Sequence, residues 1–221
     1  MKTIELMRKE NTKNVLTPRQ QSLVAIASFE AKGDIRNLET ALNKAIDKGF
    51  TLNELKEIFC HLYSYTGFPR ALNGLSALQR VLADRLAKGL TCEEGRMASP
   101  LPYDFDALKE GTKVQTSLFG NDDYPFVPAM DYYLKAHLFG DVFANDLLEH
   151  KERELLTISA LASINGLEIQ LTGHLEGAQN KGMTKEEMYS YVQTLTDLGD
   201  EETAQRARKA VAEHFNGPND K

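Results

Sequence analysis

An internal repeat constrains this 221-residue chain more than any other feature. The run that begins at Leu148 mirrors the run that begins at Leu16, at an offset of 132 residues, and Gly182 mirrors Gly49 at an offset of 133. The offset between the two copies thus changes by only one residue over more than thirty positions. Self-similarity at a nearly constant offset is typical of a duplicated structural unit. We therefore predict two copies of one unit in a single chain.

Helix start signals occur at matching places in the two copies. Thr17 is followed by a proline and by Gln20, a pattern that predicts an N-cap, a proline in the first turn and a capping box. Thr51 begins a second capping box, and Thr184 begins its counterpart in the other copy. Apolar residues between these signals recur at three- and four-residue spacing, as in amphipathic helices. The first copy is thus predicted to form four helices between Thr17 and Lys88.

The predicted fold class is all-α. No stretch shows the β-branched clusters with alternating apolar and polar positions that indicate strands. We assign the first repeat to residues 1–98 and the second repeat to residues 129–221. Residues 99–128 between them are rich in proline, glycine and aspartate, which favours turns. We expect a linker or an ordered crossing loop there.

The charge and hydropathy of the sequence argue against nucleic-acid and membrane partners. The 26 lysines and arginines against 32 acidic residues leave a net charge of −6, so no overall positive field is available to hold nucleic acid. No apolar stretch approaches a membrane span, and the amino terminus lacks the apolar core of a secretion signal. Cys60 and Cys92 are too few and too far apart for a disulfide framework. We expect a soluble, cytoplasmic protein with no nucleic-acid and no membrane partner.

Three residues suited to proton transfer follow one edge of the third predicted helix. Glu57, His61 and Tyr65 are spaced four residues apart, which places them on the same face. A carboxylate one turn before a histidine can raise its basicity, and a tyrosine one turn later can donate to a developing oxyanion. The column is a candidate catalytic site. The alternative is a purely structural helix, with the carboxylate at its solvent edge and the tyrosine in the core.

His174 is the stronger catalytic candidate because the other repeat lacks it. The equivalent position of the first repeat is Ala41, so the helix architecture does not itself require an imidazole. Gln170 lies one turn earlier on nearly the same face. Glu168 or Glu154 could orient the ring or act as an acid if burial raised its pKa. A buried neutral histidine bonded to a backbone carbonyl is the alternative interpretation.

The sequence has no motif for a metal or a cofactor. Zinc-type spacings, a glycine-rich phosphate loop, a nucleophile elbow and an EF-hand loop are all missing. Cys60 precedes His61 directly, but successive residues of a helix point about 100° apart, so this adjacency creates no thiolate pair. We expect no metal and no cofactor.

The segment from His61 to Asn73 closely resembles the H-L-x-x-Y-x-G-F-P-x-A-L-N segment of carboxymuconolactone decarboxylase-like proteins. The stretches 139–143, 151–155 and 174–187 are similar to other hallmark stretches of that family. The resemblance implies an all-helical, cofactor-free homo-oligomer with the fold of alkylhydroperoxidase D, duplicated in this chain. It also implies a lyase acting on a small anionic substrate.

Two departures from the family patterns affect the expected chemistry. The peroxidase branch carries C-x-x-C-x-x-x-H, but Leu167 and Gln170 stand where its cysteines would be. Without that thiol couple, peroxide reduction loses both its nucleophile and its disulfide product. The decarboxylase branch carries W-S-R-P after F-G-D-V, whereas this chain reads Phe143-Ala144-Asn145-Asp146. Arg70 is a candidate replacement for the missing arginine, although a solvated surface role explains it equally well.

We therefore hypothesise one pocket shared by the two repeats. His174, backed by Glu168 or Glu154, would face His61 and Tyr65 across the pocket and carry out acid–base chemistry on a small carboxylated lactone or keto acid. The expected substrate-binding residues are Gly67, Phe68, Pro69, Arg70, Asn73 and Gln170. The alternatives are an alkylhydroperoxidase-like peroxidase and a non-catalytic oligomeric binding module.

Overall fold

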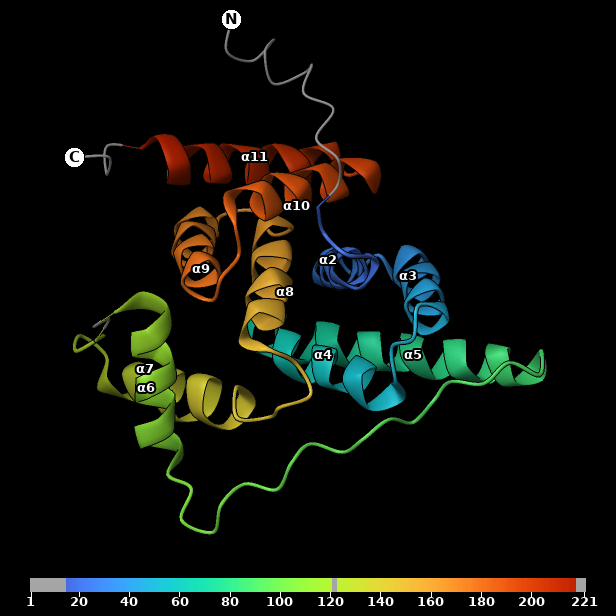
Figure 1. Cartoon of the computed structure of the whole chain (residues 1–221), viewed down its shortest axis with the longest axis horizontal. Coiled ribbons are helices and arrows are strands. Elements are labelled where there is room, and N and C mark those ends of the chain that lie inside the picture. The colour runs from blue at the N-terminus through green and yellow to red at the C-terminus, as the bar shows by residue number, and fades with distance from the viewer. Residues whose placement is uncertain (1–14, 121–122, 218–221) are drawn as a thin grey trace, which may run out of the picture.

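The computed structural model describes residues 15–120 and 123–217, and within these ranges the chain is helical and contains no strand. The all-α prediction is therefore confirmed (Figure 1). The first repeat forms α2 (Pro18–Lys32), α3 (Ile35–Asp47), α4 (Leu52–Thr66) and α5 (Phe68–Ala87). The second forms α8 (His150–Ala162), α9 (Glu168–Asn180), α10 (Lys185–Asp197) and α11 (Glu201–Asn216). Between them lie α6 (Ala107–Phe119), α7 (Pro128–Tyr132) and the π-helix η1 (Tyr133–Val142).

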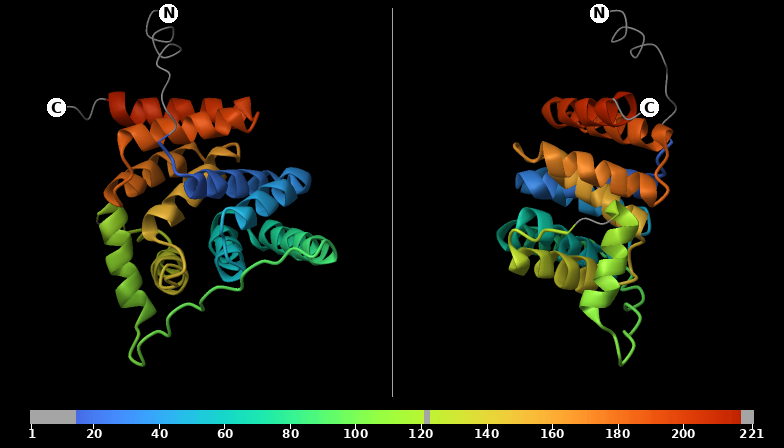
Figure 2. Two further views of the ribbon diagram at one scale, coloured as in Figure 1. Left: turned by 45° about the vertical axis from the view of Figure 1, so that its right-hand side comes forward. Right: turned by 90° about the vertical axis from the view of Figure 1, so that its left-hand side faces the viewer.

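The two repeats are arranged in three layers related by an approximate two-fold axis. Helices α10 and α11 form one outer layer, α4 and α5 form the other, and α2, α3, α8 and α9 lie between them (Figures 1 and 2). The contacts among these eight helices occur in matching pairs: α2 packs on α3 as α8 packs on α9, and α4 packs on α5 as α10 packs on α11. The contact of α4 with α8 is likewise matched by that of α10 with α2. Each repeat therefore packs its third helix against the first helix of the other.

The predicted caps explain why the helices begin where they do. Complete capping boxes are present at Thr17, Thr51 and Thr184, and in each the hydroxyl and the third-residue side chain satisfy backbone N–H groups. Gly33 ends α2 with a left-handed φ of 72°, a conformation that glycine adopts without steric cost. These local signals set the four-helix pattern of the first repeat as predicted.

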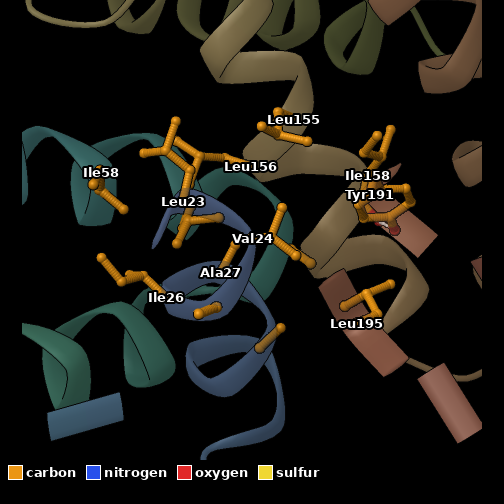
Figure 3. Packing of buried hydrophobic residues seen from close by; sticks show 14 of the residues in the cluster. Leu23, Val24, Ile26, Ala27, Ile58, Leu155, Leu156, Ile158, Tyr191 and Leu195 are labelled. Carbon is orange, nitrogen blue, oxygen red and sulfur yellow. Dashed lines mark hydrogen bonds between the residues drawn. The ribbon is translucent and has the colours of Figure 1, made fainter. Parts of the chain in front are cut away.

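Both repeats contribute to one apolar core. Leu23 and Val24 of α2 lie beside Leu156 and Ile158 of α8 and the ring of Tyr191 of α10 (Figure 3). All five side chains are almost completely buried. The repeats assigned to residues 1–98 and 129–221 are thus halves of one packed unit, because neither could bury its own apolar face alone.

The linker predicted for residues 99–128 needs correction, because Ala107–Phe119 forms the three-turn helix α6. This helix packs tightly on η1. A Cβ atom on Gly111 would lie 1.8 Å from the carbonyl oxygen of Lys135, and one on Gly140 would lie 2.3 Å from that of Ala107. Glycine lowers helix propensity, so it weakened the helical signal, but here it permits close contact between two backbones.

One buried polar cluster fixes α8 against α4. The Arg153 side chain is completely buried, and its Nη2 donates to Glu57 Oε1 at 2.7 Å and to the carbonyl oxygen of Asn145 at 2.6 Å. Its Nη1 lies 3.3 Å from His61 Nδ1. The guanidinium is always a donor, so Nδ1 accepts and the proton of the neutral ring is on Nε2. That nitrogen lies 3.1 Å from the carbonyl oxygen of Arg153 and 2.9 Å from Thr157 Oγ1.

Replacing Arg153 by methionine is expected to destabilise the fold by about 3–5 kcal/mol, because the Glu57 carboxylate would be left buried without a cation. The double variant Arg153→Met/Glu57→Gln should recover a large part of this loss, because the buried charge is then gone. Chemical denaturation of the two single variants and the double variant measures the coupling. Additive losses would contradict the role assigned to this ion pair.

Glu30 gives the fold a specific pH dependence. The side chain of Glu30 is 1% exposed, and burial raises the pKa of its carboxyl group from 4.5 to about 7 although Thr66 donates to it. The folded state therefore binds this proton more tightly than the unfolded state does. The stability that the protonated group allows is present below pH 4.5 and is lost as the pH rises through about 7.

We expect Glu30→Gln to raise the thermal midpoint by several degrees at pH 8 and to change it little at pH 5. The exposed Glu94, changed to glutamine, is the matched control for loss of one negative charge. Thermal unfolding at both pH values tests the prediction. An equal gain at pH 5 and pH 8 would show that ionisation of Glu30 is not the cause.

Candidate active site

A histidine–carboxylate pair lies at the crossing of α8 and α9. His174 Nδ1 is 2.8 Å from Glu154 Oε2. The Glu154 side chain is completely buried, whereas that of His174 is 12% exposed. Glu154 Oε1 has no hydrogen-bond partner among the described residues, so the imidazole is the polar partner of this carboxylate. The contact holds the Nδ1–H tautomer and leaves Nε2 available to a ligand.

A glycine makes the close approach of the two helices possible. Gly177 lies three residues after His174 on α9. A Cβ atom at this position would lie 3.0 Å from Glu154 Oε2 and 2.8 Å from Cε1 of Phe119. Any larger residue would therefore require both side chains, which contact the imidazole, to shift. The packing of α8 on α9 places the carboxylate, and the absence of a side chain at Gly177 leaves room for it.

Aromatic rings from two other segments enclose the His174 ring. Tyr65 of α4 and Phe119 of α6 contact it edge-on, with centroid distances of 5.3 and 5.1 Å. The Tyr65 hydroxyl is buried and makes no hydrogen bond of normal geometry to the described residues. Burial, followed by the negative charge of Glu154, raises the pKa of Tyr65 well above its usual range. Tyr65 therefore stays neutral and can donate a proton in a hydrogen bond.

His61 lies next to the same tyrosine but in a different environment. Its ring is 5.3 Å from that of Tyr65 and is completely buried. Burial, and then the positive charge of Arg153, lowers the pKa of His61 well below its usual value. Both ring nitrogens already have partners within the protein. This arrangement suits a neutral positioning residue better than the proton carrier that the sequence suggested.

The structure distinguishes between the two glutamates considered for His174. Glu154 contacts the ring, whereas Glu168 is exposed in the first turn of α9, where its Oε1 accepts from the backbone N–H of Gly166. Gln170 is also exposed. Neither Glu168 nor Gln170 makes a hydrogen bond or an ion pair with His174 in the described ranges.

The predicted substrate-binding turn lies at the surface where α4 gives way to α5. Phe68 is 65% exposed and stacks on the ring of Tyr63 at 4.7 Å. Arg70 and Asn73 are exposed. The residues predicted to bind substrate here are Gly67, Phe68, Pro69, Arg70 and Asn73. Within residues 15–120 and 123–217, no hydrogen bond, ion pair or ring contact connects any of them to His174 or Glu154. The structure thus brings together His174, Glu154, Tyr65 and His61 and leaves the turn outside this group.

Sequence reasoning missed two residues that shape the site. Phe119 lies in the segment interpreted as a linker, and nothing near it in the sequence indicates that it contacts His174. For Arg153, the sequence did contain a signal that could have identified it. The repeat comparison that selected His174 also pairs Arg153 with Gln21 and Glu154 with Ser22, so two charged residues replace two neutral ones on the same helix.

A cavity of about 470 Å³ lies beside this group of aromatic rings. Phe143 and His150 line it, together with residues of α6 and of the preceding loop, but His174 does not. The Phe143 ring, which lines this cavity, also contacts the His61 ring, with a centroid distance of 5.5 Å. Among the described residues, no three histidine, cysteine, aspartate or glutamate side chains gather as a metal site. None of the described helices is both long and apolar enough to cross a membrane.

The chain is similar to a protein of yeast and to a solved bacterial structure. The chain is 27% identical to peroxisomal protein 2 of Saccharomyces cerevisiae, in a match that covers 60% of this chain and 56% of the yeast protein. The chain thus spans little more than half the length of that relative. A solved structure from Burkholderia xenovorans, provisionally described as a gamma-carboxymuconolactone decarboxylase subunit, is 18% identical. That match has a TM-score of 0.48 and covers 92% of this chain and 80% of the other.

A family model covers most of the sequence. It matches residues 1–80 and 128–213, one segment in each repeat. The two segments contain His61, Tyr65, Glu154 and His174, the four residues that the structure brings together. The match also agrees with the family resemblance of the sequence motifs. The chain belongs to the carboxymuconolactone decarboxylase family.

Proposed function

We propose that this protein is a cofactor-independent lyase or isomerase that moves a proton on a small carboxylated lactone or keto acid. The observation that carries the proposal is the contact between His174 Nδ1 and the completely buried Glu154 carboxylate. A buried carboxylate holds an imidazole in one tautomer and stabilises the imidazolium that forms when Nε2 takes up a proton. Acid–base catalysis needs these properties.

Both reactions can use the same nitrogen. In a decarboxylation, the bond to the carboxylate breaks, CO₂ leaves, and the electron pair stays on the carbon as an enolate. The imidazolium of His174 then gives its Nε2 proton to that carbon. In an isomerisation, neutral Nε2 first takes a proton from a carbon next to a carbonyl and returns it at another atom. General acid–base catalysis of this type contributes about 10²–10⁴-fold.

Tyr65 is suited to stabilise the enolate oxygen. Its hydroxyl is buried, neutral and without a protein partner of normal geometry, and its ring contacts that of His174. A preorganised neutral donor is most effective where water is excluded. The ring of Phe119 contacts that of His174 and adds an apolar wall to the site. In this proposal His61 and Arg153 position α4 and do not exchange protons with the substrate.

The structure gives less support to a thiol peroxidase. Cys60 is exposed and Cys92 half-buried, and partial removal from water raises the pKa of both thiols, with the charge of Glu57 adding to the effect at Cys60. A raised pKa reduces the thiolate fraction at neutral pH, and the thiolate is the attacking species. The alternative of a non-catalytic binding module is distinguished by experiment below.

The first test is His174→Gln, which keeps a hydrogen-bonding group but cannot carry a proton. We expect it to lower kcat by about 100-fold or more, with little change in the thermal midpoint. Release of CO₂ and uptake of solvent deuterium at carbon, across a panel of small carboxylated lactones and keto acids, measure the two reactions. His137→Gln is the matched control, because the side chain of His137 is 53% exposed on η1.

Unchanged turnover in His174→Gln would refute the assignment of the proton carrier. If the wild-type protein binds a member of the panel without turnover, and His174→Gln binds it equally well, the protein is a binding module. Thermal shift measures this binding, because a ligand that binds only the folded state raises the midpoint.

Two glycine variants on α9 test whether the geometry of the pair matters. Gly177→Ala should lower kcat by about tenfold or more, because its Cβ atom displaces Glu154 and Phe119. Gly173→Ala is the control on the same helix, because its Cβ atom meets nothing within 4 Å. Alanine at position 173 should stabilise the helix by about 0.5–1 kcal/mol and leave kcat unchanged. Equal kcat values for the two variants would count against the need for a close pair.

A further inference from the structure

The approximate two-fold relation between the repeats gives the chain a second candidate site, in the place equivalent to the His174 site. The first site is built from α8, α9 and α4. The equivalent helices α2, α3 and α10 surround a cavity of about 330 Å³. Its walls include Ser22, Lys44, Lys48, Thr194 and Asp197. Cavities of this size hold small organic molecules.

This second cleft lacks the acid–base groups of the first. By the repeat offset, Ala41 replaces His174 and Ser22 replaces Glu154. The same comparison places Leu198 at the position of Tyr65. All three of these residues line the cavity. The cleft therefore has the shape of a ligand site, but it lacks the imidazole, the carboxylate and the tyrosine on which the proton transfer proposed for His174 depends.

Positive charge replaces the lost groups. Lys48 Nζ donates to Ser22 Oγ at 3.2 Å and to the carbonyl oxygen of Pro18 at 3.3 Å, which holds the ammonium over the position equivalent to Glu154. Lys44, one turn earlier, makes no hydrogen bond or ion pair with any described residue. Neither lysine is within ion-pair distance of a carboxylate in the described ranges. Two lysine side chains thus line the cleft, and neither forms an ion pair with a described carboxylate.

One carboxylate limits the kind of anion that fits. Asp197 lines the same cavity, and its Oδ1 accepts from Gln193 Nε2 at 2.7 Å. The two lysines and Asp197 together leave one positive charge in the lining, which matches a ligand with one negative charge, and a donor group on that ligand could bind to the other oxygen of Asp197. The side chains of Ala25 and Phe29 add apolar surface for a short carbon chain.

We propose that the cleft between α2, α3 and α10 is a non-catalytic binding site for a small organic monocarboxylate that carries a hydroxyl or ammonium donor. The carboxylate of the ligand pairs with Lys44 and Lys48, and its donor group faces Asp197. This inference does not depend on the reaction proposed for His174, because the two sites share no lining residue.

Three compounds of one carbon skeleton test the proposal: 3-hydroxybutyrate, 3-aminobutyrate and butyrate. Binding to the full chain is measured by calorimetry and by protection of Lys44 and Lys48 from an amine-reactive reagent. We expect at least one of the two donor-bearing compounds to bind more tightly than butyrate, and the neutral butyramide not to bind. The two donor-bearing compounds distinguish a hydroxy acid from an amino acid as the preferred ligand.

Substitutions of Lys44 and Lys48 test the predicted contacts, and because both side chains are exposed, these variants should keep the fold. Lys44→Met and Lys48→Met should each weaken binding by about three- to tenfold, and more together, because each removes one charged contact. Asp197→Asn should reduce the preference for the donor-bearing compounds over butyrate. Lys56→Met, on α4, is the control for loss of an exposed charge and should bind as the wild type does.

His174→Gln separates this proposal from the proposed function. If the cleft is the site, His174→Gln binds the tightest compound unchanged, whatever its effect on turnover. Loss of binding in His174→Gln, with binding retained in the Lys44→Met/Lys48→Met double variant, would place the ligand in the first site and overturn the proposal. Absence of binding by all three compounds at concentrations of tens of millimolar would also overturn it.

Discussion

The buried guanidinium of Arg153 is the interaction on which the rest of the site depends. A completely buried arginine is costly unless its hydrogen bonds are made, and here they join Glu57, His61 and a backbone carbonyl into one cluster. The cluster connects α8 of the second repeat to α4 of the first. It sets how far α4 lies from α8, and therefore where Tyr65, one turn after His61, meets the site.

Helix α8 serves two interfaces through consecutive residues. Successive side chains on a helix diverge by about 100°, so Arg153 reaches α4 while Glu154 reaches His174 on α9. Every residue from Arg153 to Ala162 is buried, which leaves the helix no solvent-facing side over this length. A shift of α8 would disturb both partners at once. The contact between repeats and the contact within the second repeat are therefore mechanically linked.

The sequence was sufficient to predict the features that follow from local signals, such as helix caps, and those that follow from comparing the two repeats. The capping boxes at Thr51 and Thr184 were visible because each involves residues three positions apart. His174 was visible because its equivalent is Ala41. The sequence could not choose between Glu154 and Glu168, since that choice depends on the crossing of α8 and α9. The contact between Phe119 and His174 could not be foreseen, because the two residues lie 55 positions apart in the sequence. In addition, Gly111 weakened the helical signal of α6, the helix that carries Phe119.

The first repeat shows that this scaffold does not need a buried carboxylate at the position of Glu154. Helices α2 and α3 pack as α8 and α9 do, with Ser22 and Ala41 in place of Glu154 and His174. Removing a carboxylate from water costs several kcal/mol, and the second repeat bears that cost while the first avoids it in the same architecture. The buried carboxylate of the second repeat is therefore tied to the imidazole that it contacts and not to a requirement of the helix packing that both repeats share. At the equivalent place in the first repeat, Ser22 and Ala41 line a cavity whose walls also include Lys44 and Lys48.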